Sequence, residues 1–145
     1  MDSGELSKVP WATWYAIMTP ESVTIILSLP PKVLQPNCTV ATIGGRFKKA
    51  AATKRYRRLA KEAIEAECIE TRPWGKVAVK AIFYFSYARR RDPDNANGSL
   101  KAAYDGIVDA GLVVDDDYEH MERMPPTFKD DKAYPRVELT ITRIE

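Results

Sequence analysis

The residues that most often bind zinc are scarce in this sequence of 145 residues. It has one histidine, His120, and two cysteines, Cys38 and Cys68, which lie far apart and form no CxxC pair. A zinc site takes closely spaced cysteine and histidine ligands, so we expect no zinc centre. Isolated cysteines are typical of reducing compartments, and we expect both thiols to be free.

Long apolar runs are also missing. A helix needs about 20 apolar residues to span a bilayer, and no stretch approaches that length in a chain with 29% charged residues. The N-terminus carries Asp2 and Glu5 where a signal peptide has basic residues. We therefore expect no membrane partner and a cytoplasmic location.

A strong excess of either charge is absent as well, because the net charge is only +2. The distribution is more informative than the total. Basic residues gather in segments 46–61 and 89–91, and acidic residues gather in 115–122. This separation is compatible with a DNA-facing surface around an acidic pocket.

The hydrophobic residues that are present, 45% of the chain, are enough for the core of one domain. Their spacing has period two in the expected strands and helical period elsewhere, and the strand at 77–87 is apolar on both faces, as in a central strand. We predict an α/β (α+β) fold with a small mixed β-sheet of about four strands and two main helices packed on one face. The expected strands are 23–29, 77–87, 119–124 and 137–144, and the expected helices are 49–67 and 93–110.

Residues 1–22 are interpreted as an N-terminal appendage to a single domain at 23–145. An aromatic stretch in the appendage is bounded by Pro10 and Pro20. This favours a short helical turn packed on the domain, and a contact with a partner is the alternative.

Prolines and glycines predict a loop of about 15 residues that ends at Gly44-Gly45, and loops of this length are often functional. Arg46, Lys48 and Lys49 follow directly. The cations of the helix that comes next either face solvent or contact phosphates.

The most informative stretch is RRRDPDN at residues 89–95, where three arginines run directly into two aspartates. Carboxylate oxygens suit a hard cation such as magnesium or manganese, and arginines suit phosphate. Asp92 and Pro93 also make a favourable helix start, so capping alone explains them locally. Capping does not explain the arginines or the second acidic cluster at 115–117, which together favour a metal site that acts on a phosphodiester.

The helix predicted after this stretch places Asp94, Lys101 and Asp105 on one face, at spacings of seven and four. Lys101 there either pairs with Asp105 or stabilises the charge that develops in phosphate hydrolysis. An EF-hand is excluded, because Ala103 stands where a calcium loop needs a glutamate. Gly111 is expected to end the helix, and the apolar residues 112–114 to lead the acidic cluster back to the sheet.

Four segments taken together resemble the RusA family of Holliday junction resolvases: RRRDPDN, KAAYDGI, AGLVVDD and the terminal RVELTIT. Members of that family are small, dimeric, magnesium-dependent endonucleases of bacteria and prophages. The resemblance is detailed over residues 77–145 and weaker over 23–67.

By position, the essential acids of that family correspond to Asp92, Asp94 and Asp116, which are the implied metal ligands, and its catalytic lysine corresponds to Lys101. About three extra residues near Asn97 separate the acidic pair from the lysine. In a regular helix they shift Lys101 by roughly one pitch of 5.4 Å, and a later helix start would restore its position. The triple aspartate leaves Asp115 as the alternative third acid.

The resemblance implies a homodimeric endodeoxyribonuclease that uses Mg2+, with Mn2+ as a substitute, to resolve four-way DNA junctions. It would act in DNA recombination and repair in the cytoplasm of a bacterium or a phage-infected host. A preference for forks or flaps, or non-catalytic binding of branched DNA, are the alternatives. The residues expected to hold the DNA backbone are Arg89, Arg90, Arg91, Arg46, Lys48 and Lys49.

Overall fold

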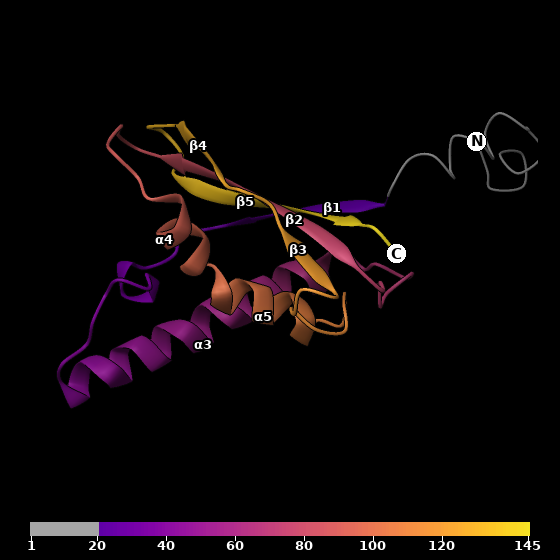
Figure 1. Ribbon diagram of the computed structural model, residues 1–145, viewed down its shortest axis with the longest axis horizontal. Coiled ribbons are helices and arrows are strands. Elements are labelled where there is room, and N and C mark those ends of the chain that lie inside the picture. Colours follow the sequence, from indigo (N-terminus) through magenta and orange to yellow (C-terminus); the bar gives the residue numbers. More distant parts are fainter. Residues whose placement is uncertain (1–20) are drawn as a thin grey trace, which may run out of the picture.

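The structure is a computed structural model that describes residues 21–145. The predicted appendage at 1–22 therefore lies almost wholly outside the described residues (Figure 1). In chain order the elements are β1 (Ser22–Leu27), the short 3-10 helix η1 (Lys32–Leu34), α3 (Ile43–Ala66), β2 (Val77–Phe85), α4 (Pro93–Gly98), α5 (Lys101–Asp109), β3 (Met121–Arg123), β4 (Thr127–Asp130) and β5 (Arg136–Arg143).

One mixed sheet of five strands forms the centre of the molecule. Its order is β1-β5-β2-β3, and β4 pairs with β2 further along the same edge. β5 runs antiparallel to both β1 and β2, whereas β3 and β4 run parallel to β2. The mixed sheet and the two longer helices confirm the predicted fold class.

β2 is the central strand, as predicted, because it pairs with β5 on one side and with β3 and β4 on the other. Only one of its two apolar faces is buried: Val77, Val79, Ala81 and Phe83 point inward, and the residues between them are partly exposed. β1 and β5 alternate in the same way. The inward side chains of the three strands therefore form a continuous apolar layer.

The helices cover this buried face of the sheet (Figure 1). α3 contributes Ala52, Tyr56, Ala60 and Ile64 to the core, four residues apart on one side of the helix. The Tyr56 hydroxyl donates to the backbone oxygen of Ser28 at 2.7 Å, which satisfies its one polar group at the edge of the core. No helix within residues 21–145 has the length and apolar character that a membrane crossing requires.

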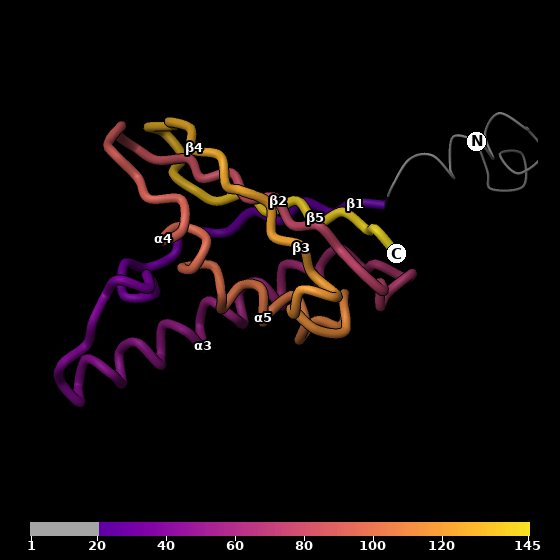
Figure 2. The backbone as a smooth tube through the Cα atoms, in the orientation of Figure 1, coloured from indigo at the N-terminus to yellow at the C-terminus, as the bar shows by residue number. Residues whose placement is uncertain are grey.

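α3 begins earlier than predicted, and the expectation that Gly44-Gly45 belongs to a loop is wrong. Thr42 is the N-cap residue: its hydroxyl accepts from the Gly45 N–H at 3.0 Å. This cap offsets the low helix propensity of two glycines in the first turn. Figure 2 shows the chain leaving β1, passing beside α4 and then turning into α3.

β4 is a strand that was not predicted, because its four residues show no alternation and Pro125-Pro126 precede it. The Met124 N–H donates to the Val79 oxygen at 2.9 Å, and pairing with β2 resumes where Thr127 lies beside Ile82. The two prolines therefore interrupt the pairing only locally. It is the exposed edge of β2 that makes these residues a strand.

α5 approaches α3 very closely at Gly106. A Cβ atom at this position would lie 2.2 Å from the backbone oxygen of Arg57 and 2.9 Å from the Cβ atom of Ala60. The backbone of a long helix cannot yield locally to such a contact. Glycine at position 106 therefore sets the distance between the two helices.

We expect Gly106→Ala to lower the free energy of unfolding by about 2 kcal/mol, because an added methyl group overpacks the core. Urea denaturation followed by circular dichroism measures this change. Gly44→Ala is the matched control: it lies in α3 with nothing within 4 Å of its added Cβ, so stability should be unchanged or slightly higher. Equal effects of the two substitutions would contradict the close approach.

Candidate functional site

The helix predicted over residues 93–110 is two helices, and the interruption decides where Lys101 lies. α4 ends at Gly98, and the buried Ser99 hydroxyl donates to the Ala96 oxygen at 2.6 Å. Leu100 is fully buried and serves as the N-cap of α5, so Lys101 is the first residue of the second helix. The regular helix that would place Asp94 on the face of Lys101 is therefore absent. The helix start is not delayed, because α4 begins at Pro93; instead the helix is interrupted after Gly98 and a second helix begins at Lys101.

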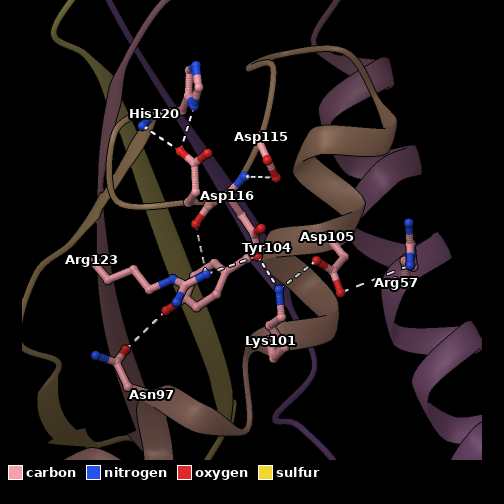
Figure 3. Close-up of polar contacts among 10 residues, drawn as sticks. Arg57, Asn97, Lys101, Tyr104, Asp105, Asp115, Asp116, His120 and Arg123 are labelled. Atoms are coloured by element: carbon pink, nitrogen blue, oxygen red, sulfur yellow. Dashed lines mark hydrogen bonds and ion pairs between the residues drawn. The ribbon is translucent and has the colours of Figure 1, made fainter.

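Lys101 is bound on two sides by carboxylates. Its ammonium group contacts Asp105 Oδ1 at 3.0 Å, one helical turn along α5, and it also donates to Asp116 Oδ2. Figure 3 shows the ammonium group between these two side chains. The predicted ion pair with Asp105 is confirmed, and the additional partner comes from the loop that follows α5.

The residues 112–114 bring Asp116 to this position. Leu112 and Val113 are buried as predicted, whereas Val114 is exposed. Gly111 ends the helix with φ +80°, a conformation that favours glycine. The chain thus reverses directly after α5 and returns Asp116 to the beginning of the same helix.

Arg123, at the end of β3, holds Asp116 from the other side. Its Nη2 donates to Asp116 Oδ2 at 3.0 Å and to the Asp116 backbone oxygen at 3.2 Å. Its guanidinium group lies over the ring of Tyr104, 4.6 Å from the centroid, and the Tyr104 hydroxyl donates to Asn97 Oδ1 at 3.0 Å (Figure 3). Arg123, Tyr104 and Asn97 were not predicted, because nothing in their sequence positions marks them as neighbours of Asp116.

The ion pairs continue to α3 through Arg57. Its guanidinium group donates to Asp109 and lies 4.0 Å from Asp105. Figure 3 shows Arg57 reaching toward Asp105 from the neighbouring helix. Positive and negative groups therefore alternate from α3 to β3, in the order Arg57, Asp105, Lys101, Asp116 and Arg123.

The pKa shifts agree with this alternation. Partial burial lowers the pKa of Lys101, but the hydrogen bonds to Asp116 and Asp105 outweigh it, and the pKa is raised overall. Burial raises the pKa of Asp116, and the nearby charges of Lys101 and Arg123 more than reverse this, so the pKa is lowered. Burial raises the pKa of Tyr104 to about 12, so its hydroxyl remains a donor at neutral pH.

The first two predicted acids lie at the start of α4. Asp92 is its N-cap, and its carboxylate accepts from the Asp94 N–H at 3.0 Å. Both side chains are exposed, and neither forms an ion pair with any residue from 21 to 145. The capping role of Asp92 is thus confirmed.

The metal-ligand role of the acids stays a prediction. In the described part of the chain, no three His, Cys, Asp or Glu side chains are grouped so that they could hold a metal ion. Asp92, Asp94 and Asp116 are therefore not gathered as a preformed metal site. Asp116 faces Lys101, whereas the Asp115 carboxylate accepts from the Asp116 N–H at 2.7 Å and so stabilises the loop.

The arginine run lines a cleft of about 400 Å3 next to Asp92. Its walls are the loop after β1, the end of β2 and α4. The guanidinium carbon of Arg91 lies over the ring of Phe85, 3.7 Å from the centroid. The other predicted DNA-binding cations, Arg46, Lys48 and Lys49, belong to the first turns of α3 and do not line this cleft.

Comparison with known proteins agrees with these features. A protein-family model described as endodeoxyribonuclease RusA matches residues 29–142. The match begins just after β1 and ends within β5, so it includes both acidic clusters, the arginine run and Lys101. No curated protein matches the chain.

We expect Asp105→Asn to lower the pKa of Lys101, because the substitution removes one of the two carboxylates that favour the ammonium form. The measurement is an NMR pH titration of the Lys101 side chain. Glu62→Gln is the control. Glu62 forms an ion pair with Arg58 at the same i,i+4 spacing, but on α3 and not on α5. A Lys101 titration that is the same in wild type and Asp105→Asn would contradict the paired arrangement.

Proposed function

The chain belongs to the endodeoxyribonuclease RusA family, and on this basis we propose that it is a structure-specific endonuclease that resolves four-way DNA junctions in recombination and repair. The observation that carries the proposal is the family match over residues 29–142. The association of Lys101 with Asp116 supports it, because it brings together two groups that are far apart in the sequence and suited to phosphate chemistry.

The proposal includes Mg2+ as cofactor, with Mn2+ as a substitute, and Asp92, Asp94 and Asp116 as its ligands. The type of donor supports it, since carboxylate oxygens suit hard cations. When bound, the metal would activate water and stabilise the leaving oxygen. To take part, Asp116 has to share a carboxylate that now accepts from Lys101 and Arg123.

Lys101 is proposed to stabilise negative charge on the phosphate during hydrolysis. Its raised pKa keeps it protonated at neutral pH, which this role requires. Asp105 is proposed to orient it, because the 3.0 Å contact ties the flexible lysine side chain to α5.

The DNA backbone is proposed to contact the arginine run and the first turns of α3. Two observations support this assignment: Arg89, Arg90 and Arg91 line one cleft beside Asp92, and they have no carboxylate partner among the described residues. Contacts to phosphate need no base recognition. Arg46, Lys48 and Lys49 would extend the basic surface.

A homodimer is proposed as the active form. A two-fold dimer presents two equivalent sites, and a four-way junction offers two strands of matching polarity, so the symmetry of enzyme and substrate would agree. Paired cuts in one binding event would follow from this arrangement.

The first test is cleavage of a synthetic four-way junction in Mg2+, beside a linear duplex of the same sequence. We expect wild type to make symmetric nicks in the junction and none in the duplex. Asp94→Asn should reduce the rate by about two orders of magnitude or more, because it removes a charged metal ligand. Gel analysis of end-labelled strands measures both.

Glu65→Gln is the control for this substitution, since Glu65 is another exposed acid without an ion pair among the described residues, and we expect full activity. Tight binding of the junction without cleavage products in Mg2+ or Mn2+ would contradict the nuclease proposal. The protein would then be a non-catalytic protein that binds branched DNA. Faster cleavage of forks or flaps than of junctions would change the proposed substrate.

A second test concerns the arginine run. We expect Arg90→Ala to weaken junction binding and to reduce the slope of log K against log salt by about 1, as for the loss of one phosphate contact. Fluorescence anisotropy over a series of salt concentrations measures the slope. Arg72→Ala removes an exposed arginine outside the cleft and should leave the slope unchanged. The same slope for wild type and Arg90→Ala would show that Arg90 does not contact a DNA phosphate.

A further inference from the structure

The cleft beside Asp92 has rigid walls. The loop after β1 is tied to α4 by the Asn37 N–H, which donates to Asn95 Oδ1 at 3.3 Å. The same loop packs so closely that a Cβ on Gly98 would lie 2.3 Å from the Pro36 ring. The cleft therefore exists before anything binds in it, and its volume of about 400 Å3 falls in the range of small-molecule sites.

Positive charge dominates the lining. Lys32, Arg89, Arg90 and Arg91 all line the cleft, whereas Asp92 is the only acid among the lining residues that the structure describes. None of the four cations forms an ion pair with a residue in the range 21–145, in contrast to Lys101 and Arg123, which are paired. This uncompensated charge is suited to an anionic ligand.

Arg91 adds an independent observation. Its Nε atom is buried and has no hydrogen-bond partner, and its Nη2 makes only a 3.3 Å contact with the Tyr87 oxygen. Buried donors normally have a hydrogen-bond partner, so the free Nε is unusual. The guanidinium group lies over the rings of Phe85 and Tyr87, and much of its hydrogen-bonding capacity is unused. A cation in this state is suited to receive a phosphate.

The rest of the lining is suited to a ligand that has more groups than a phosphate. Phe85 and Tyr87 provide aromatic surface, and the amides of Gln35 and Asn37 provide donors and acceptors. Tyr87 is 55% exposed, so it is the most accessible aromatic residue of the lining. Aromatic rings beside cations and amides are the features with which proteins hold single-stranded nucleotides.

We propose that this cleft binds one unstacked nucleotide of branched DNA, next to the phosphate to be cut: the cations hold its phosphate, and Tyr87 and the amides hold its base. This inference rests on the proposed function. A base that is stacked inside a duplex cannot enter the cleft, so the nucleotide must first leave the stack. The free-energy cost of unstacking is lowest at a branch point or at an unpaired position. The enzyme should therefore favour branches with an unpaired nucleotide at the crossover.

Binding to two four-way junctions tests this. Each carries one extra unpaired nucleotide at the crossover, which has a base in one junction and is abasic in the other. We expect wild type, in EDTA, to bind the base-containing junction about tenfold more tightly, as for one stacked base. Fluorescence anisotropy gives the ratio of the two dissociation constants. Both junctions have the same phosphates, so phosphate contacts do not change this ratio.

Tyr87→Ala should bring this ratio close to one, and Tyr87→Phe should retain it. Tyr134→Ala is the matched control, because Tyr134 is 54% exposed, also lies beneath an arginine, and does not line the cleft. Gln35→Ala, in the loop after β1, should lower the ratio without affecting the fold, because no side-chain hydrogen bond of Gln35 is found in the described residues.

A wild-type ratio of one would overturn the proposal, and so would a ratio that Tyr87→Ala and Gln35→Ala leave unchanged. Cleavage of the fully paired junction in Mg2+ is measured on the same preparation. If this cleavage occurs while the ratio is one, only the nucleotide site is wrong. If cleavage is absent while the ratio is high, the nuclease proposal fails and the nucleotide site remains.

Discussion

The contact between Lys101 and Asp116 connects the parts of this protein that carry its chemistry. It joins the first residue of α5 to the loop that follows the same helix, and Arg123 extends it to the edge of the sheet. The side chain of Lys101 is 59% exposed, so the pair contributes little to stability. Its importance is positional, because it sets where one carboxylate and one ammonium group stand. The contact itself depends on the break at Ser99-Leu100, on Gly111, and on Gly106, which lets α5 lie against α3.

The basic residues of the protein fall into two electrostatic classes. Arg57, Lys101 and Arg123 are each matched by carboxylates, so they organise the acids and leave little free charge. The arginines of residues 89–91 have no such partner among the described residues, and Arg89 and Arg91 lie over aromatic rings. The unpaired arginines are therefore the ones suited to attract a DNA backbone over a distance, because their charge is not neutralised by neighbouring carboxylates. Charge composition alone cannot separate the two classes, since the net charge of the chain is only +2.

Asp92 caps a helix and is also a proposed metal ligand, and both roles use its carboxylate oxygens. As the N-cap of α4 it accepts a backbone hydrogen bond, and as a proposed ligand it would face a cation. A carboxylate has enough lone pairs for both, so capping and metal binding are compatible. The cap would then also orient the carboxylate for the metal. A short α4 held by Asp92 at one end and by the buried Ser99 at the other gives that carboxylate a defined position.

The sequence by itself determined the elements that local chemistry controls. Alternating apolar residues predicted β1, β2 and β5, Asp92-Pro93 predicted the start of α4, and Gly111 the end of α5, because period-two burial, capping and positive φ each depend on a few neighbouring residues. Its motif also predicted the family that the comparison shows. The tertiary structure decided the rest. β4 exists because β2 offers an edge, the helix breaks where Leu100 enters the core, and Arg123 reaches Asp116 because β3 lies beside β2. These features depend on contacts between residues distant in the chain, and such contacts leave no local pattern.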